Sequence, residues 1–195
     1  MPRLFTALEI PRDAALSLSL LRGGLPGARW VDVENYHITL RFIGDVEGHV
    51  ADEIASSLDR VRRPAFTLAL SGVGAFGSKK PHSIWAGIAP APDLNALQSE
   101  IERICQRLGL ASDARRFTPH VTLARLRNSS PMEVASYLSA RGNFSTAPFR
   151  VGRFVLMSSR DSIGGGPYVV EGTWPLHSGP AISPADATEG GRLHR

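Results

Sequence analysis

The sequence predicts an α+β fold with two pseudo-symmetric lobes, each made of an antiparallel sheet with flanking helices, around a central cleft. Two observations predict it. Stretches with strand-like and helix-like periodicity are mixed along the chain. One arrangement of these stretches also occurs twice, each copy beginning at a His-apolar-Thr-Leu motif, at residues 37–40 and 120–123. A repeat this long indicates two similar lobes rather than a solenoid.

The individual elements are predicted from the period of the apolar residues. Helices are expected where apolar residues recur every three to four positions, at 14–25, 49–63, 94–110 and 132–140, with Asp93 as N-cap of the third and Gly109 near its end. Strands are expected where β-branched and aromatic residues alternate with polar ones, at 4–10, 28–33, 37–43, 65–73, 83–89, 120–126, 149–158 and 167–174.

The two copies of the motif are in register with the stretches downstream of them. From His37 to Phe66 is 29 residues, as is His120 to Phe149, and from His37 to Trp85 is 48, as is His120 to Tyr168. The sequence therefore predicts a single bilobal domain over 1–176 with repeat units at about 3–89 and 83–176. Residues 177–195 are polar and rich in Gly, Pro and Ala, which favours a disordered tail.

Composition narrows the class of protein. The chain has 195 residues, 43% hydrophobic and 21% charged, as in ordinary globular domains, and no stretch of roughly 20 apolar residues that would span a membrane. Its first residues alternate like a strand rather than forming a signal peptide. A single cysteine, Cys105, excludes an intrachain disulfide, is expected to be buried, and favours the cytoplasm. The net charge of +4 suits a polyanionic partner without requiring one.

The doubled motif has a chemical interpretation. Along a strand, His37 and Thr39 point to one face and His120 and Thr122 do likewise, while the apolar residues between them face the core. Two imidazoles facing each other across a cleft can act as general base and general acid, and threonine hydroxyls can hold the oxygens of a phosphate between them. Duplication could also preserve these residues for packing alone.

Several ordered stretches resemble one family, the two-histidine (2H) phosphoesterases, and within it the RNA 2′,3′-cyclic phosphodiesterases of the 2′-5′ RNA ligase family. They are WVDVENYHITLRFIG, GAFGSKKPHSIWAGI, RFTPHVTLAR and LMSSRDSIGGGPYVVEGTWPL. The resemblance implies a bilobal fold, no metal or other cofactor, and hydrolysis of the 2′,3′-cyclic phosphate end of RNA, or of a related cyclic nucleotide, to a 2′-phosphate. It further implies His37 as proton donor, His120 as proton acceptor, and Thr39 and Thr122 as phosphate ligands.

Two arginines are candidates for phosphate binding. Arg125 matches the arginine of the family's second motif, but it lies five residues after His120, so it faces the site only if a bulge interrupts the strand. Arg41, four residues after His37, has the correct parity on a regular strand. Its counterpart in the second repeat is Ala124.

The loop at 71–83 is a candidate for nucleic-acid contact, because Phe76, Lys79, Lys80 and His82 combine an aromatic with cations. A solvated turn with Phe76 in the core explains it almost as well. The sequence shows no metal-binding motif. We expect a monomeric enzyme, with 2′-5′ joining of RNA ends and a non-catalytic RNA-end binding module as alternatives.

Overall fold

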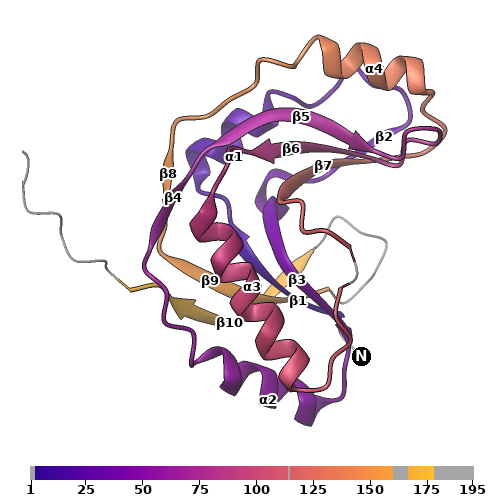
Figure 1. Ribbon diagram of the computed structural model, residues 1–195. Coiled ribbons are helices and arrows are strands. Elements are labelled where there is room, and N and C mark those ends of the chain that lie inside the picture. Colours follow the sequence, from indigo (N-terminus) through magenta and orange to yellow (C-terminus); the bar gives the residue numbers. More distant parts are fainter. Residues whose placement is uncertain (1–2, 114, 160–166, 178–195) are drawn as a thin grey trace, which may run out of the picture.

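The computed structural model describes residues 3–113, 115–159 and 167–177 (Figure 1). Its helices are α1 (Arg12–Ser19), the 3₁₀ turn η1 (Val33–Asn35), α2 (Gly48–Leu58), α3 (Pro92–Arg107) and α4 (Pro131–Ser139). Its strands are β1 (Arg3–Glu9), β2 (Ala28–Trp30), β3 (His37–Asp45), β4 (Phe66–Leu68), β5 (Leu70–Phe76), β6 (Ser83–Ile88), β7 (His120–Leu126), β8 (Phe149–Val151), β9 (Arg153–Ser159) and β10 (Tyr168–Pro175).

Eight strands form one curved sheet in the order β10-β9-β1-β3-β7-β6-β5, with β2 also paired to β7, and β4 and β8 form a separate ribbon. All these pairs are antiparallel. The predicted α+β class is therefore confirmed. β3 and β7 pair only between Ile38 and Val121, so the sheet consists of two halves joined where the histidine strands meet.

The repeat is visible in the order of the elements, but the half-sheets are built across it. β3, α2, β4 and β5 begin at residues 37, 48, 66 and 70, and β7, α4, β8 and β9 begin 83 residues later, at 120, 131, 149 and 153. The half-sheet that contains β3 is completed by β9 and β10 of the second unit, whereas β5 and β6 of the first unit pair with β7. Each half of the sheet thus mixes strands of both units, and the expected one-to-one match of unit and lobe is corrected.

Several predicted boundaries were wrong. The helix expected at 14–25 ends at Ser19, because Leu20, Leu21 and Arg22 donate to carbonyls three residues back and tighten the chain into a turn. The helix expected at 49–63 ends at Leu58, where Pro64 disfavours helical geometry shortly downstream.

The third predicted helix and two predicted strands also need correction. α3 begins at Pro92 after Ala91, so Asp93 lies in its first turn rather than at the N-cap. The strand expected at 149–158 divides at Gly152 into β8 and β9, which join different sheets, and the strand expected at 65–73 divides into β4 and β5 in the same way.

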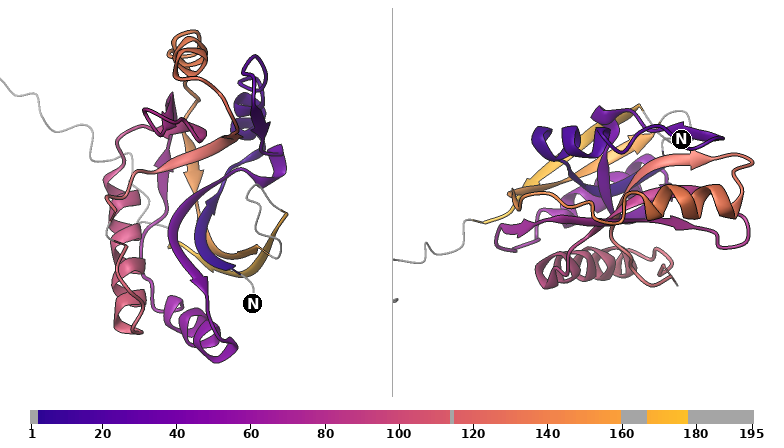
Figure 2. Two further views of the ribbon diagram at one scale, coloured as in Figure 1. Left: turned by 90° about the vertical axis from the view of Figure 1, so that its right-hand side faces the viewer. Right: turned by 90° about the horizontal axis from the view of Figure 1, so that it is seen from above.

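The core lies between the sheet and its helices. α3 packs against β3 and α2 (Figures 1 and 2). Leu94, Leu97, Ile101 and Cys105 on its inner face are fully buried, which confirms the prediction for the cysteine. No helix in the described part of the chain is long and apolar enough to cross a bilayer. His177, the first residue of the predicted tail, still forms backbone hydrogen bonds with Arg63 and Ala65, and residues 178–195 lie outside the described residues.

Candidate active site

A β-bulge lies just after the threonine in both histidine strands. In β3, Thr39 lies opposite Ala7 and Arg41 opposite Thr6, so Leu40 is an extra residue. In β7, Leu123 is the extra residue in the same way, between partners of Trp85 and Ile84. Burial has one pattern over 37–42 and 120–125: the second, fourth and fifth residues are buried, and the sixth is exposed. The bulge thus turns residue 42 and residue 125 to the face that carries the histidine and threonine.

This register decides between the two candidate arginines. Arg125 lies on the cleft face, because the bulge in β7 supplies the change of parity that a regular strand lacks. Arg41 lies on the opposite face, only 8% exposed, where it forms an ion pair with Glu102 of α3 and donates to the carbonyls of Phe42 and Ala111. The prediction that Arg41 faces the substrate was therefore wrong, because it assumed an uninterrupted strand.

Both histidines are oriented by the same backbone contact. His37 Nδ1 lies 2.8 Å from the carbonyl oxygen of Asn35, and His120 Nδ1 lies 2.7 Å from that of Thr118. A carbonyl oxygen only accepts, so Nδ1–H donates in each ring. Nε2 is consequently the atom of each imidazole that can take up or release a proton.

Aromatic rings enclose each imidazole. Two rings contact each histidine, with centroid separations of 5.0 Å for Phe5–His37, 4.9 Å for Tyr168–His37, 4.9 Å for Phe76–His120 and 6.1 Å for Trp85–His120. Trp85 and Tyr168 occupy equivalent positions in the repeat, 48 residues after their histidines. The enclosure fixes the rings and keeps water from most of their surface.

The electrostatic environment favours the neutral form of both rings. Burial lowers the pKa of His37, the hydrogen bond to Asn35 opposes this, and the charges of His120 and Arg125 lower the pKa further. Burial likewise lowers the pKa of His120, opposed by the bond to Thr118 and assisted by Arg125. A bound anion would offset this cationic field, so the site is suited to phosphate.

One cavity of about 250 Å³ brings the doubled motif together. It is lined by both histidines and both threonines of the motifs and by Arg125, with Val31, Asn35, Phe76, His82, Ser83, Arg115 and Tyr168. Among the described residues that line it, none carries a carboxylate. The candidate site residues predicted from the sequence therefore share one cavity, with the exception of Arg41.

Some lining residues were not identified from the sequence. Tyr168 had a signal, since the repeat places it opposite Trp85. Arg115 had none, because it lies in the segment before β7, which has no counterpart of similar composition in the first unit. Asn35 and Thr118 orient the histidines through their carbonyl groups, which any residue provides. Within the described ranges, no group of three or more His, Cys, Asp or Glu side chains could hold a metal ion.

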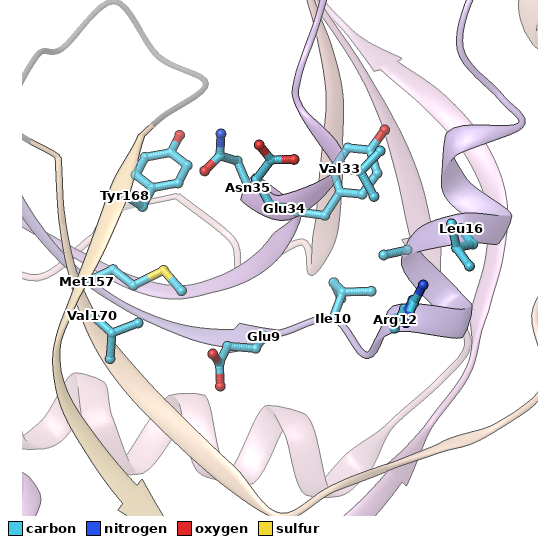
Figure 3. Close-up of a pocket in the computed structure, with 12 residues that line it drawn as sticks. Glu9, Ile10, Arg12, Leu16, Val33, Glu34, Asn35, Met157, Tyr168 and Val170 are labelled. Carbon is cyan, nitrogen blue, oxygen red and sulfur yellow. The ribbon is translucent and has the colours of Figure 1, made fainter.

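Two further cavities adjoin the first on the side of His37. One, of about 190 Å³, shares His37, Thr39, Arg125 and Tyr168 with it and adds Arg3, Phe5, Phe42 and Ser159. The other, of about 460 Å³, lies beyond Asn35 and Tyr168, which stand together at its rim (Figure 3). Its walls are largely apolar, with Ile10, Leu16, Val33, Met157 and Val170, and its carboxylates are Glu9 and Glu34. The cationic cavity thus borders an acidic one.

Comparison with known proteins defines the class to which this fold and site belong. The profile of the 2′-5′ RNA ligase superfamily matches residues 21–162, and the chain belongs to this family. An RNA 2′,3′-cyclic phosphodiesterase of Aeropyrum pernix is 39% identical over 122 residues, which cover 62% of this chain and 69% of the relative. A protein of that name from Geobacillus stearothermophilus is 35% identical over 128 residues, 62% of this chain and 41% of its own length. The crystal structure of E. coli LigT complexed with 3′-AMP superposes with a TM-score of 0.74 at 28% identity, covering 90% of this chain and 99% of LigT.

Proposed function

We propose that this protein hydrolyses the 2′,3′-cyclic phosphate end of RNA, or a related cyclic nucleotide, to a 2′-phosphate by general acid–base catalysis with two histidines. One observation carries the proposal. Two imidazoles from equivalent strands line one cationic cavity, and each has its Nδ1 bound to the carbonyl two residues before it, which leaves Nε2 for proton transfer. The names of the relatives support the substrate class.

The reaction needs one proton acceptor and one proton donor. In the proposed mechanism, neutral His120 takes a proton from water through Nε2 as the oxygen attacks phosphorus. The bond from phosphorus to O3′ breaks, and protonated His37 gives its proton to O3′, so that the phosphate stays on O2′. Thr39, Thr122 and Arg125 bind the non-bridging oxygens, whose negative charge grows in the transition state.

The first test is product analysis. Purified protein is incubated with 2′,3′-cyclic AMP, and the 2′- and 3′-monophosphates are separated by chromatography. We expect 2′-AMP alone. Formation of 3′-AMP would place the departing oxygen on the other side of phosphorus, and no hydrolysis would leave only a binding module, which is the alternative without catalysis.

The assignment of acid and base has its own test. Sulfur leaves without protonation, so a cyclic substrate with a 3′-S–P bond does not need the acid. The proposed roles predict that this substrate restores activity to His37→Ala and fails to restore it to His120→Ala. Rescue of His120→Ala instead would reverse the two roles.

A second activity, the joining of RNA ends in a 2′-5′ linkage, is favoured by the family to which the chain belongs. Here a 5′-hydroxyl replaces water, and the same two histidines transfer the protons. No nucleotide triphosphate is consumed, because the cyclic phosphate itself is the activated end. Joining in the absence of ATP would support this activity, and a requirement for ATP would contradict it.

We further propose that the protein works as a monomeric domain spanning residues 1–176 in the cytoplasm. The single, buried cysteine suits a reducing compartment. Light scattering would give a mass near 21.0 kDa for a monomer. A mass twice as large, or fractionation with the cell envelope, would contradict the proposal.

A further inference from the structure

The hairpin that joins β5 to β6 stands beside His120 in a fixed conformation. His82 N–H donates to the carbonyl of Phe76 at 3.0 Å and closes its neck. Gly77 has φ +86°, and a Cβ there would lie 2.2 Å from the carbonyl oxygen of Lys80, so only glycine permits this tight turn. The backbone N–H of Leu126 donates to the carbonyl of His82 at 2.9 Å and ties the hairpin to the end of β7.

Two rings of this hairpin form a stacked pair at the edge of the cavity. The rings of Phe76 and His82 are 6.3 Å apart and 25° from parallel, and Phe76 also contacts His120 edge-on at 4.9 Å. Phe76 and His82 both line the cavity, and His82 is exposed. Such a pair offers a flat surface on which a nucleobase can stack.

The charges on this side of the cavity are positive. Lys79 and Lys80 are exposed in the hairpin loop, and Arg115, which lines the cavity, has a side chain 85% exposed and only one carboxylate partner, Asp113 at 3.3 Å. The flank beyond Tyr168 has Glu9 and Glu34 instead. A polyanion is therefore attracted to the hairpin side and repelled by the other flank.

The direction of the reaction assigns this surface to one reactant. In the proposed mechanism the nucleophile approaches from the side of His120, and O3′ with its ribose lies on the side of His37. The RNA that carries the cyclic phosphate is attached through that ribose. The hairpin is consequently on the side of the attacking group.

We propose that the β5–β6 hairpin is the binding site for an RNA strand with a free 5′-hydroxyl, which takes the place of water. Its first base stacks on Phe76 and His82, and Lys79 and Lys80 bind its phosphates. His120 takes the 5′-hydroxyl proton, the 5′-oxygen bonds to phosphorus, the bond to O3′ breaks, and His37 protonates O3′, which gives a 2′-5′ linkage with no other reactant. This inference rests on the proposed function and names the second substrate of the same site.

The test uses the double variant Lys79→Ala/Lys80→Ala. Neither lysine lines the catalytic cavity, so we expect kcat/KM for 2′,3′-cyclic AMP to stay within about twofold. A hexaribonucleotide with free 5′- and 3′-hydroxyls should inhibit this hydrolysis, with a Ki at least about tenfold higher in the variant at low salt. The slope of log Ki against log salt should fall by about 1.4, since each phosphate contact with a single strand contributes about 0.7.

The matched control is Arg103→Ala/Arg107→Ala, which removes the same charge from exposed positions on α3 and should leave Ki unchanged. A second substrate separates the two sides of the phosphorus: KM for a hexamer that ends in a cyclic phosphate should not change in the lysine variant. An unchanged Ki, a raised KM for that hexamer, or no inhibition of the wild type at about 1 mM would each overturn the proposal. If the wild type did not hydrolyse 2′,3′-cyclic AMP, the proposed function would fail, and fluorescence anisotropy of the same hexamer with both proteins would still decide whether the hairpin binds RNA.

Discussion

Arg41 and Arg125 occupy neighbouring positions in the two bulges, yet the structure assigns them opposite roles, and substitution by methionine should separate them. Arg41 is 8% exposed, and the side chain of its partner Glu102 is 16% exposed. Removal of one member leaves the other charge buried without compensation. We expect Arg41→Met to lower the free energy of unfolding by about 3–5 kcal/mol.

The double variant Arg41→Met/Glu102→Met supplies the internal check. Replacement of a whole buried ion pair by apolar side chains of similar size is often neutral or stabilising. The double variant should therefore be more stable than Arg41→Met alone. A coupling energy below about 0.5 kcal/mol would refute the reasoning, because residues that do not interact give additive effects.

Arg125→Met should behave in the reverse manner. Arg125 is exposed, so its loss should change the free energy of unfolding by less than about 0.5 kcal/mol. A hydrogen bond to a charged group contributes about 1.5–3 kcal/mol, so kcat/KM for 2′,3′-cyclic AMP should fall by about ten- to 150-fold. Urea denaturation monitored by tryptophan fluorescence measures stability, and initial rates well below the unfolding transition measure activity. The assignment fails if Arg41→Met is as stable as wild type or if Arg125→Met retains full activity.

Four further outcomes are expected from the geometry of the site. His37→Ala and His120→Ala should each lower kcat by about two orders of magnitude or more, with unchanged circular dichroism. The dependence of kcat/KM on pH should be bell-shaped and lie on the acidic side, because both histidine pKa values are lowered and the acid loses its proton below pH 6.5; a single plateau would contradict paired catalysis. Stability should fall as pH decreases below 6.5 toward the lowered pKa values, since the unfolded chain binds protons there that the folded chain does not, and scanning calorimetry of His37→Asn should show a weaker dependence. Hydrolysis should continue in EDTA, and its loss on chelation would indicate a metal mechanism.

The sequence predicted the part of the site that local periodicity controls. Alternation along a strand is sufficient to place His37 with Thr39 and His120 with Thr122, and the equal spacing of the two motifs predicted that the strands would be equivalent. The bulges could not be predicted from alternation, because an extra residue such as Leu40 is as apolar as its neighbours. Only the pairing with Ala7 and Thr6 reveals it, and this pairing moved Arg41 from the cleft to the core.

The exchange of strands was beyond the reach of the sequence for a related reason. A repeat predicts two similar units, but the choice of partner depends on long-range pairing that local pattern does not record. Gly152 is an example: it divides one apolar stretch between two sheets, and its composition alone is compatible with an unbroken strand.

This exchange also constrains how the protein forms during its synthesis. Phe5 pairs with Met157, so the edge of β1 has to wait until the ribosome has added about 150 more residues, roughly 8 to 30 seconds at the usual rate of translation. An apolar strand edge that stays open for so long invites pairing with other nascent chains. The half of the sheet that holds the first histidine is therefore completed last, and a polypeptide truncated before β9 would be an aggregation-prone fragment rather than a smaller functional protein.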